Sequence, residues 1–340
     1  MSSSNRVNYS IRLNKSIERK IMAEGINLIV STLKFDYSYI GFGSLWFIDF
    51  IHFHKFLNIR EMYSIESDKI IYKRAEYNNP YHCITVLNGE STEGLDTILD
   101  EEEHPCIIWL DYDANIFECS SFVSDVNSIV SKAKNGSILI ATMNANNKIV
   151  RDLKTRAKGD EWKDITVDSL KNTFGNVQIT TTVNKQFTNQ EKFIQLVNPL
   201  FSQTIENSIY NSGNKKRHFK IFDFAYADNA TMVTLGFILF DEAEASSINR
   251  LTPFSKPYFL NENTFNISAP VLTVREKNSI DKNLPSGDIN RFIRENGTFE
   301  SEAEVYLKPD KLGFPIHEQT FRSYSEIYKY YPTYFEIMHS

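Results

Sequence analysis

Short apolar runs alternate with amphipathic segments through the first 145 residues of the chain. Apolar positions at helical spacing predict helices at 13–33, 46–57, 69–76, 92–99 and 121–133. Compact apolar runs between them predict strands at 37–40, 62–66, 83–87, 106–110 and 136–142. The run at 106–110 is continuously apolar, which is typical of a strand buried on both faces. This alternation indicates parallel βαβ units.

A different connection follows further along the chain. Two apolar segments, 220–226 and 232–240, are separated by only five residues. A linker this short permits only an antiparallel hairpin, because parallel neighbours need a long crossover. The pattern therefore predicts an α/β protein with a Rossmann-like, mostly parallel seven-stranded sheet that ends in an antiparallel hairpin.

After residue 245 the alternation of strands and helices ends, and the chain becomes polar with several prolines. We predict helices at 273–282, 286–295 and 318–330. The expected organisation is an N-terminal helix leading into the core (1–34), a Rossmann-like domain (35–245) and a C-terminal helical appendage (246–340).

Composition narrows the class of partner and compartment. The formal net charge is −6 and the pI is about 5.7, which argues against a dedicated nucleic-acid binder. The one compact basic run, 215–218, is interpreted as a solvated turn before a strand. Three widely spaced cysteines without a CxxC pair indicate neither a zinc site nor a disulfide framework. With no apolar leader and no run long enough to cross a bilayer, we expect a cytoplasmic protein without a membrane partner.

The first candidate site is the turn Gly41-Phe42-Gly43-Ser44, which follows the first strand and precedes a helix. Glycine there lets a ligand approach the backbone, and the helix start offers free N–H groups. A plain tight turn is the alternative. The third glycine of a dinucleotide fingerprint would fall at Trp46, whose bulk argues against a pyrophosphate. S-adenosylmethionine has no pyrophosphate and tolerates this departure.

An acidic residue, Glu66, ends the second strand about twenty residues after the glycines. A carboxylate in this place can accept hydrogen bonds from both hydroxyls of a ribose. The alternative is an ordinary exposed strand end. Asp68 is a weaker neighbour that can simply start the next helix.

Two further strand ends carry polar residues. After the third strand, Asn88 or Glu90 could accept from an adenine amine, or the loop 88–91 is only a polar turn. After the fourth strand, Asp111 should face Gly41 across the switch in strand order, where it could hold a methionine ammonium or orient an acceptor. Capping of the next helix is the alternative for Asp111 and for Asp113.

The charges of the first helix and two histidines are given structural roles. The charged residues of the first helix, Lys15, Glu18, Arg19 and Lys20, are interpreted mostly as a solvated face. His52 and His54 are two residues apart and so face different directions, which makes them poor metal ligands as a pair. We predict no metal site.

The runs YIGFGSLWFIDFIHFHKFL, SIESD, IIWLDYDA and GSILIATMNA, with the terminal segments RLNKSIERK, LTVREKNSID, LGFPIHE and YKYYPTYFEI, resemble bacterial proteins described as O-methyltransferases of unknown substrate. The resemblance spans nearly the whole chain. It implies a class I S-adenosylmethionine site with the cofactor turn at 41–44, the ribose carboxylate at Glu66 and the active-site edge at Asp111. One departure is Tyr39, where the family pattern usually has an acidic residue that helps to hold the methionine end.

Three functions remain open. The first is an S-adenosylmethionine-dependent methyltransferase, O-directed, acting on a small-molecule or protein acceptor, with Asp111 or Asp113 as the base if one is used. The second is a non-catalytic ligand-binding or assembly subunit, which Tyr39 and the Tyr-rich C-terminus motivate and which implies a protein partner or a homo-oligomer. The third, a nicotinamide-dependent oxidoreductase, does not account for Trp46 or the terminal hairpin.

Overall fold

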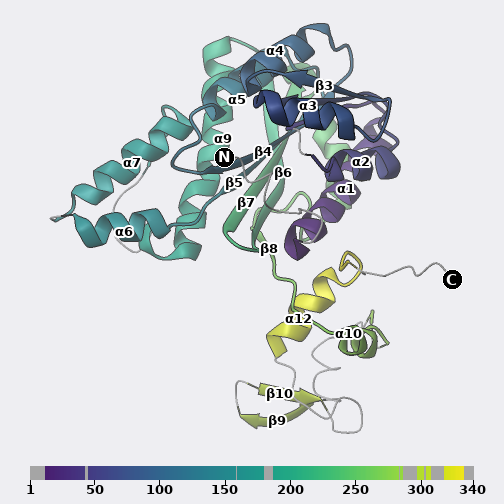
Figure 1. The fold of residues 1–340 in the computed structure, drawn as a ribbon, viewed down its shortest axis with the longest axis vertical. Coiled ribbons are helices and arrows are strands. Elements are labelled where there is room, and N and C mark those ends of the chain that lie inside the picture. Colours follow the sequence, from purple (N-terminus) through teal and green to yellow (C-terminus); the bar gives the residue numbers. More distant parts are fainter. Residues whose placement is uncertain are drawn as a thin grey trace.

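The computed structural model is built on one eight-stranded mixed sheet in the order β3-β2-β1-β4-β5-β7-β6-β8 (Figure 1). It describes residues 12–42, 45–157, 159–179, 187–282, 284–285, 297–301, 304–307 and 318–332. Strands β1 to β5 are parallel, β7 is antiparallel to both β5 and β6, and β8 is parallel to β6. The strands are β1 (Ser38–Phe42), β2 (Met62–Glu66), β3 (Ile84–Asn88), β4 (Cys106–Asn115), β5 (Ile138–Asn144), β6 (Lys216–Ala227), β7 (Thr231–Asp241) and β8 (Phe265–Ile267).

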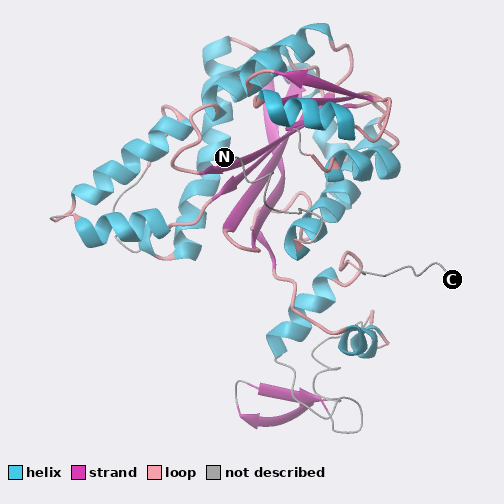
Figure 2. Ribbon diagram, in the orientation of Figure 1, coloured by secondary structure: helices cyan, strands magenta, loops and turns pink. Residues whose placement is uncertain are grey.

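Helices cover both faces of this sheet (Figure 2). One apolar core lies under α1 (Leu13–Leu33), α2 (Ile48–Leu57) and α3 (Lys69–Asn78). The other lies under α4 (Ser91–Glu101), α5 (Phe122–Lys132) and α9 (Gln190–Ser212). Neighbouring strand residues point to opposite faces, so Trp109 enters the first core and Leu110 the second. Burial on both faces explains why the central strands have no polar alternation.

The predicted order of elements is confirmed, with additions. The first seven strands and their hairpin are as expected, and the eighth strand, β8, extends the β6 edge. No helix was predicted between residues 143 and 215, where α6 (Lys148–Arg156) and α7 (Glu161–Phe174) form an arm beside α9 (Figure 1). Strand β4 continues five residues past the predicted end at Leu110.

The C-terminal part contains more than helices. Two 3₁₀ segments, η3 (Glu242–Arg250) and η4 (Thr252–Phe254), follow β7, and α10 (Val274–Asp281) and α12 (Glu318–Ile327) match two predicted helices. Between them, β9 (Gly297–Ser301) and β10 (Glu304–Leu307) form an antiparallel pair, although this part was expected to be helical. The helix predicted at 286–295 lies outside the described residues. The domain boundaries stay a prediction.

The C-terminal segment packs on the first helix through Tyr330. Its hydroxyl donates to Glu24 Oε2 at 2.5 Å and lies 2.9 Å from the Tyr258 hydroxyl. Its carbonyl accepts from Lys20 Nζ at 2.9 Å. Tyr330 therefore belongs to a packing interface between the C-terminal segment and α1. Within the described parts of the chain, no helix combines the length and the apolar character needed to cross a bilayer.

Candidate functional site

The sheet brings the predicted strand ends to one edge. Strand β1 lies between β2 and β4, and Gly41 is in register with Ser64 on one side and Trp109 on the other. Glu66 and Asp111 each lie two residues further toward the same edge. Connections from β1 and β4 leave in opposite directions, so this is the switch point where open α/β sheets bind ligands.

Position 41, near the end of β1, has no room for a side chain. A Cβ placed on Gly41 would lie 2.7 Å from the Tyr39 hydroxyl oxygen, closer than any normal contact. Phe42, the next residue, is half-buried and packs edge-on against Tyr112 with ring centroids 5.2 Å apart. Gly43 and Ser44 lie outside the described residues. Gly41 itself lies inside β1, and its cofactor role stays a prediction.

Tyr39 occupies the position where the family pattern has an acidic residue. Its hydroxyl binds a carboxylate of α2, Asp49. Its ring packs edge-on against Phe50 and Phe53 of α2, and its hydroxyl donates to Asp49 Oδ2 at 2.5 Å. Burial raises the pKa of Asp49, and a nearby Arg19 opposes that rise. Asp49 is thus a site candidate that sequence reasoning missed, because its position depends on how α2 packs on β1.

The loop between β1 and α2 holds an unusual backbone conformation. Phe47 precedes α2 at a φ of 47°, in the left-handed region, with its side chain fully buried. A bulky residue rarely adopts this conformation, and such strain tends to occur at functional loops. Trp46, at the third-glycine position, is 49% exposed beside it.

Glu66 ends β2 opposite Asn88 of β3. Its Oε1 accepts from the Asp68 N–H at 3.0 Å, and its main-chain carbonyl accepts from Asn88 Nδ2 at 2.9 Å. Asp68 caps α3 by accepting from the Ile70 and Ile71 N–H groups, as its alternative interpretation predicted. Asn88 therefore braces the strand end that carries Glu66. The ribose role of Glu66 and the adenine role of Asn88 stay predictions.

The loop after β3 is held by hydrogen bonds to a buried carboxylate of α5. Glu90 is exposed at the start of α4, and its side chain forms no cap. The next residue, Ser91, donates to both oxygens of Asp125, which is fully buried and also accepts from Tyr112 at 2.6 Å. Burial raises the pKa of Asp125, and these hydroxyl donors oppose the rise. These hydrogen bonds hold the start of α4 next to the loop 88–91, for which the sequence predicts an adenine contact.

Asp111 is held by a buried lysine of the first helix. Lys15 Nζ donates to Asp111 Oδ1 at 2.9 Å and lies 3.2 Å from Glu18 Oε2. The Lys15 side chain is 3% exposed and Asp111 32%. Lys15 also lies over the Trp109 ring, 4.5 Å from its centroid. Burial raises the pKa of Glu18, which accepts a short hydrogen bond from Thr234.

This network overturns one expectation about the first helix. Lys15, Glu18 and Arg19 were expected on a solvated face, yet all three are buried. The stripe formed by Met22 and Ile26 continues toward the N-terminus through positions 15, 18 and 19, so the charges fall on the buried side. Lys15 and Glu18 are functional candidates that this periodicity could have revealed.

The helix-capping alternative for Asp111 and Asp113 is wrong. Both lie within β4, and α5 begins only at Phe122. The register of β4 against β5 shifts between Asp111 and Asn115, which marks a bulge of the kind found next to active sites. The Asp113 side chain lies outside what the structure describes, so its catalytic role stays a prediction.

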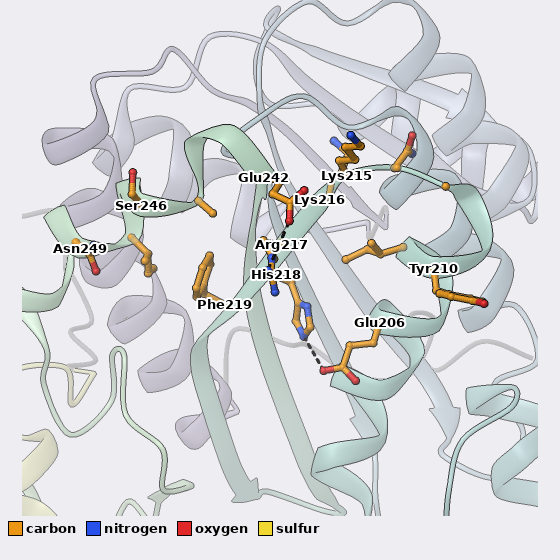
Figure 3. Close-up of a pocket in the computed structure, with 15 residues that line it drawn as sticks. Glu206, Tyr210, Lys215, Lys216, Arg217, His218, Phe219, Glu242, Ser246 and Asn249 are labelled. Atoms are coloured by element: carbon orange, nitrogen blue, oxygen red, sulfur yellow. Dashed lines mark ion pairs between the residues drawn. The ribbon is translucent and has the colours of Figure 1, made fainter.

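Two other clusters lie away from this edge. In the described part of the chain, Glu61, Glu102 and His104 place ligand-type atoms within 4.8 Å of one another. They precede β2 and β4, at the opposite edge of the sheet, and such spacing alone does not make a metal site. The basic run at 215–218 lies along a groove of about 990 Å³ beside β6 (Figure 3).

The basic run begins β6 and is more than a solvated turn. Lys216 Nζ lies 3.5 Å from Asp241 and donates to the Ala133 carbonyl at 2.5 Å. Arg217 pairs with Glu242 at 3.6 Å, and His218 Nε2 lies 3.9 Å from Glu206 (Figure 3). Lys216 and Arg217 therefore have carboxylate neighbours, and burial lowers the pKa of His218 to about 4, so its ring is uncharged at pH 7.

The strand order, the parallel core with its terminal hairpin and the ligand edge together define a Rossmann-like protein with class I methyltransferase topology. Over residues 7–339 the sequence matches the model of a family described as "Putative O-methyltransferase", and the chain belongs to that family. No curated protein matches the sequence.

Solved structures are similar to parts of this chain at low identity. A Pyrococcus horikoshii protein in complex with S-adenosyl-L-methionine is 11% identical over 72% of this chain and 61% of that chain, with a TM-score of 0.44. An O-methyltransferase from Bacillus cereus in complex with SAH is 10% identical over 64% of this chain and 80% of that chain, with a TM-score of 0.35. We draw no conclusion about activity from similarities this low.

Proposed function

We propose that this protein binds S-adenosylmethionine at the edge formed by Gly41, Glu66 and Asp111 and methylates a hydroxyl group. The supporting observation is the register of the sheet, which brings these three residues to one edge on both sides of the switch point. The three free cysteines fit a reducing cytoplasm, where we place the reaction.

The residues present fit this cofactor. The lack of a side chain at Gly41 leaves room for the Tyr39 hydroxyl at the end of β1. The Glu66 carboxylate is the hydrogen-bond acceptor that a ribose requires. The braced loop from Asn88 to Glu90 borders the adenine side. When bound, S-adenosylmethionine supplies a methyl group already activated by its sulfonium charge. The carboxylates of Glu66, Asp49 and Asp111 suit a cationic ligand.

The chain mainly has to position the acceptor. Holding two reactants in line removes most of the entropic barrier to a bimolecular transfer. Asp111 lies at the edge with one oxygen bound to Lys15, which fixes the direction of the carboxylate. Its other oxygen could receive the proton that leaves the acceptor hydroxyl. Lys15 is therefore a positioning residue for Asp111.

Calorimetry with S-adenosylmethionine tests the cofactor site. We expect saturable binding to the wild type and about tenfold weaker binding to Glu66→Gln, because a charge-assisted hydrogen bond contributes about 1.5–3 kcal/mol. Glu101→Gln, an exposed glutamate at the end of α4, is the matched control and should bind like the wild type. Absence of binding to the wild type would refute the proposal.

Turnover is tested separately, by mass spectrometry of S-adenosylhomocysteine formed over a panel of hydroxyl-bearing acceptors. We expect product with the wild type and at least a tenfold loss with Asp111→Asn. Binding of the cofactor without product across the panel would favour the second hypothesis, a ligand-binding subunit of an assembly or homo-oligomer. The specific observation behind that hypothesis is Tyr39, which replaces a direct carboxylate by one held through a hydroxyl.

A further inference from the structure

A cleft of about 410 Å³ lies between α1 and α2. Arg19 and Lys20 line it from α1, and His52 and Lys55 line it from α2, with Ile51 and Phe56 as apolar walls. The rings of His52 and Phe56 stack at 5.7 Å with an interplanar angle of 15° and form a flat surface. None of the described residues that line the cleft is acidic, and three of them, Arg19, Lys20 and Lys55, are cationic.

The proposed ligand class of the cleft depends on Arg19. It is only 6% exposed, and its Nε is buried without a hydrogen-bond partner. Among the described residues, no carboxylate forms an ion pair with its guanidinium. Asp49 is near enough for Arg19 to oppose the rise in its pKa, but this carboxylate accepts from the Tyr39 hydroxyl. Burying a charge without a partner is costly, and arginine normally satisfies it with a carboxylate or phosphate held by two parallel hydrogen bonds. The buried Nε2 of His52 also lacks a partner.

One turn of α1 separates Arg19 from the lysine that binds Asp111. Arg19 follows Lys15 by four residues on α1, which is about one turn or 6 Å along the helix axis. Lys15 in turn binds Asp111 at the end of β4. Next to Arg19, Lys20 donates to the Tyr330 carbonyl, so the C-terminal segment reaches this part of α1. A small molecule anchored at Arg19 could place a group one turn away, at Asp111.

We propose that this cleft binds the anionic group, a carboxylate or a phosphate, of a small methyl acceptor with an apolar or aromatic body. Arg19 holds the anion, Lys20 and Lys55 add positive charge, and the body of the acceptor lies against Phe56 and Ile51. This inference rests on the proposed function, because it gives that same site its substrate class. The carboxylate of the cofactor itself is the competing occupant.

The probes are 4-hydroxybenzoate and its neutral counterpart 4-hydroxybenzamide, titrated into the full-length protein by calorimetry with and without saturating S-adenosylmethionine. We expect the acid to bind at one site at least tenfold more tightly than the amide, since only the acid forms a charge-assisted pair with Arg19. Arg19→Gln should bind the acid at least tenfold more weakly. Arg217→Gln, in the groove of Figure 3, is the matched control and should bind like the wild type.

Because Arg19→Gln could fail to fold, a second variant, Lys55→Gln, tests the same cleft at an exposed position. Lys55 is exposed, so its loss should leave the thermal midpoint unchanged and weaken acid binding about threefold. Equal binding of acid and amide, no binding of either, or full binding by both Arg19→Gln and Lys55→Gln would overturn the proposal. Competition between the acid and S-adenosylmethionine would overturn it in favour of the cofactor carboxylate. Acid binding through Arg19 in a protein that does not bind S-adenosylmethionine would support the anion site and refute the methyltransferase assignment.

Discussion

Two concave regions of this protein are lined by basic residues, and they differ in how those residues are partnered. In the groove beside β6, Arg217 lies against Glu242, His218 against Glu206 and Lys216 against Asp241 (Figure 3). In the smaller cleft between α1 and α2, Arg19 is buried with an unpartnered Nε, and the lining residues that the structure describes include no acidic one. The larger and more conspicuous basic groove is therefore the less suited to an anion.

The comparison shows that local charge density in a sequence is a poor guide to a binding site. The run at 215–218 is the densest basic segment of the chain, but folding supplies it with carboxylates from α9, β7 and η3. Arg19 and Lys55 are 36 residues apart in sequence and come together only because α1 packs on α2. What matters for recognition is the charge that remains unneutralised after folding.

The largest expected difference between the two regions is in stability, when one lysine of each is replaced by methionine. Lys15→Met leaves Asp111 and the buried Glu18 without their cation, and we expect a loss of about 3 kcal/mol in the free energy of unfolding. Lys216→Met breaks a pair with an exposed Asp241 and should lose about 1 kcal/mol. Urea denaturation measures both. Equal losses would show that Lys15 is not part of a buried network.

The two histidines should respond differently to an anion. Burial lowers the pKa of His52 and of His218 to about 4, and Lys20 and Arg19 contribute for His52. Saturating phosphate should raise the pKa of His52 by about one unit, because an anion beside it favours the charged ring. The pKa of His218 should not change. Proton NMR of the two rings, assigned with His52→Gln and His218→Gln, checks this, and an unchanged His52 would contradict an anion in the cleft.

The same pKa values fix the direction of a pH effect. An unfolded histidine has a pKa of about 6.5. Both folded values are lower, so between about pH 6.5 and pH 4 the unfolded chain binds more protons than the folded protein. The free energy of unfolding should therefore fall as the pH drops through this window. In His52→Gln the fall should be smaller, which urea denaturation at pH 7 and pH 5 can measure.

Removing the carboxylates of the β6 groove should make it resemble the α1–α2 cleft. In the double variant Glu206→Gln/Glu242→Gln, Arg217 and His218 lose their acidic neighbours. We expect an additional phosphate site about threefold weaker than the Arg19 cleft, because these side chains stay more exposed than Arg19. Calorimetry counts the sites. A groove that binds phosphate equally well before and after the substitutions would remove the distinction between the two regions.

The smallest expected effect is that of Arg217→Gln on stability. Arg217 and Glu242 are both more than half exposed and 3.6 Å apart. Such a pair contributes little, so the free energy of unfolding should change by less than about 0.5 kcal/mol. Thermal melting in low and high salt is sufficient to check it. A larger loss would mean that the pair organises the groove.

Much of the fold could be read from periodicity, because each apolar run or amphipathic segment carries its own burial pattern. The five parallel strands and the hairpin of β6 and β7 were predicted within a few residues. Strand β8 was missed because three residues are too short for a recognisable pattern. The extension of β4 was missed because Asp111, Asp113 and Asn115 end the apolar run, and the register against β5 shifts between Asp111 and Asn115. Helices α6, α7 and α9 were missed although their apolar residues enter the second core.

For the site, the sequence determined which residues end the parallel strands, and hence that Gly41, Glu66 and Asp111 share an edge. Strand order follows from short connections and handedness, so these positions need no knowledge of side-chain packing. Only the tertiary structure decided that Asp49 reaches that edge through Tyr39, that Lys15 pairs with Asp111 and that Arg19 Nε has no hydrogen-bond partner. Those facts depend on how α1 and α2 pack against the sheet and against each other, and long-range packing of this kind leaves no local signature in the chain.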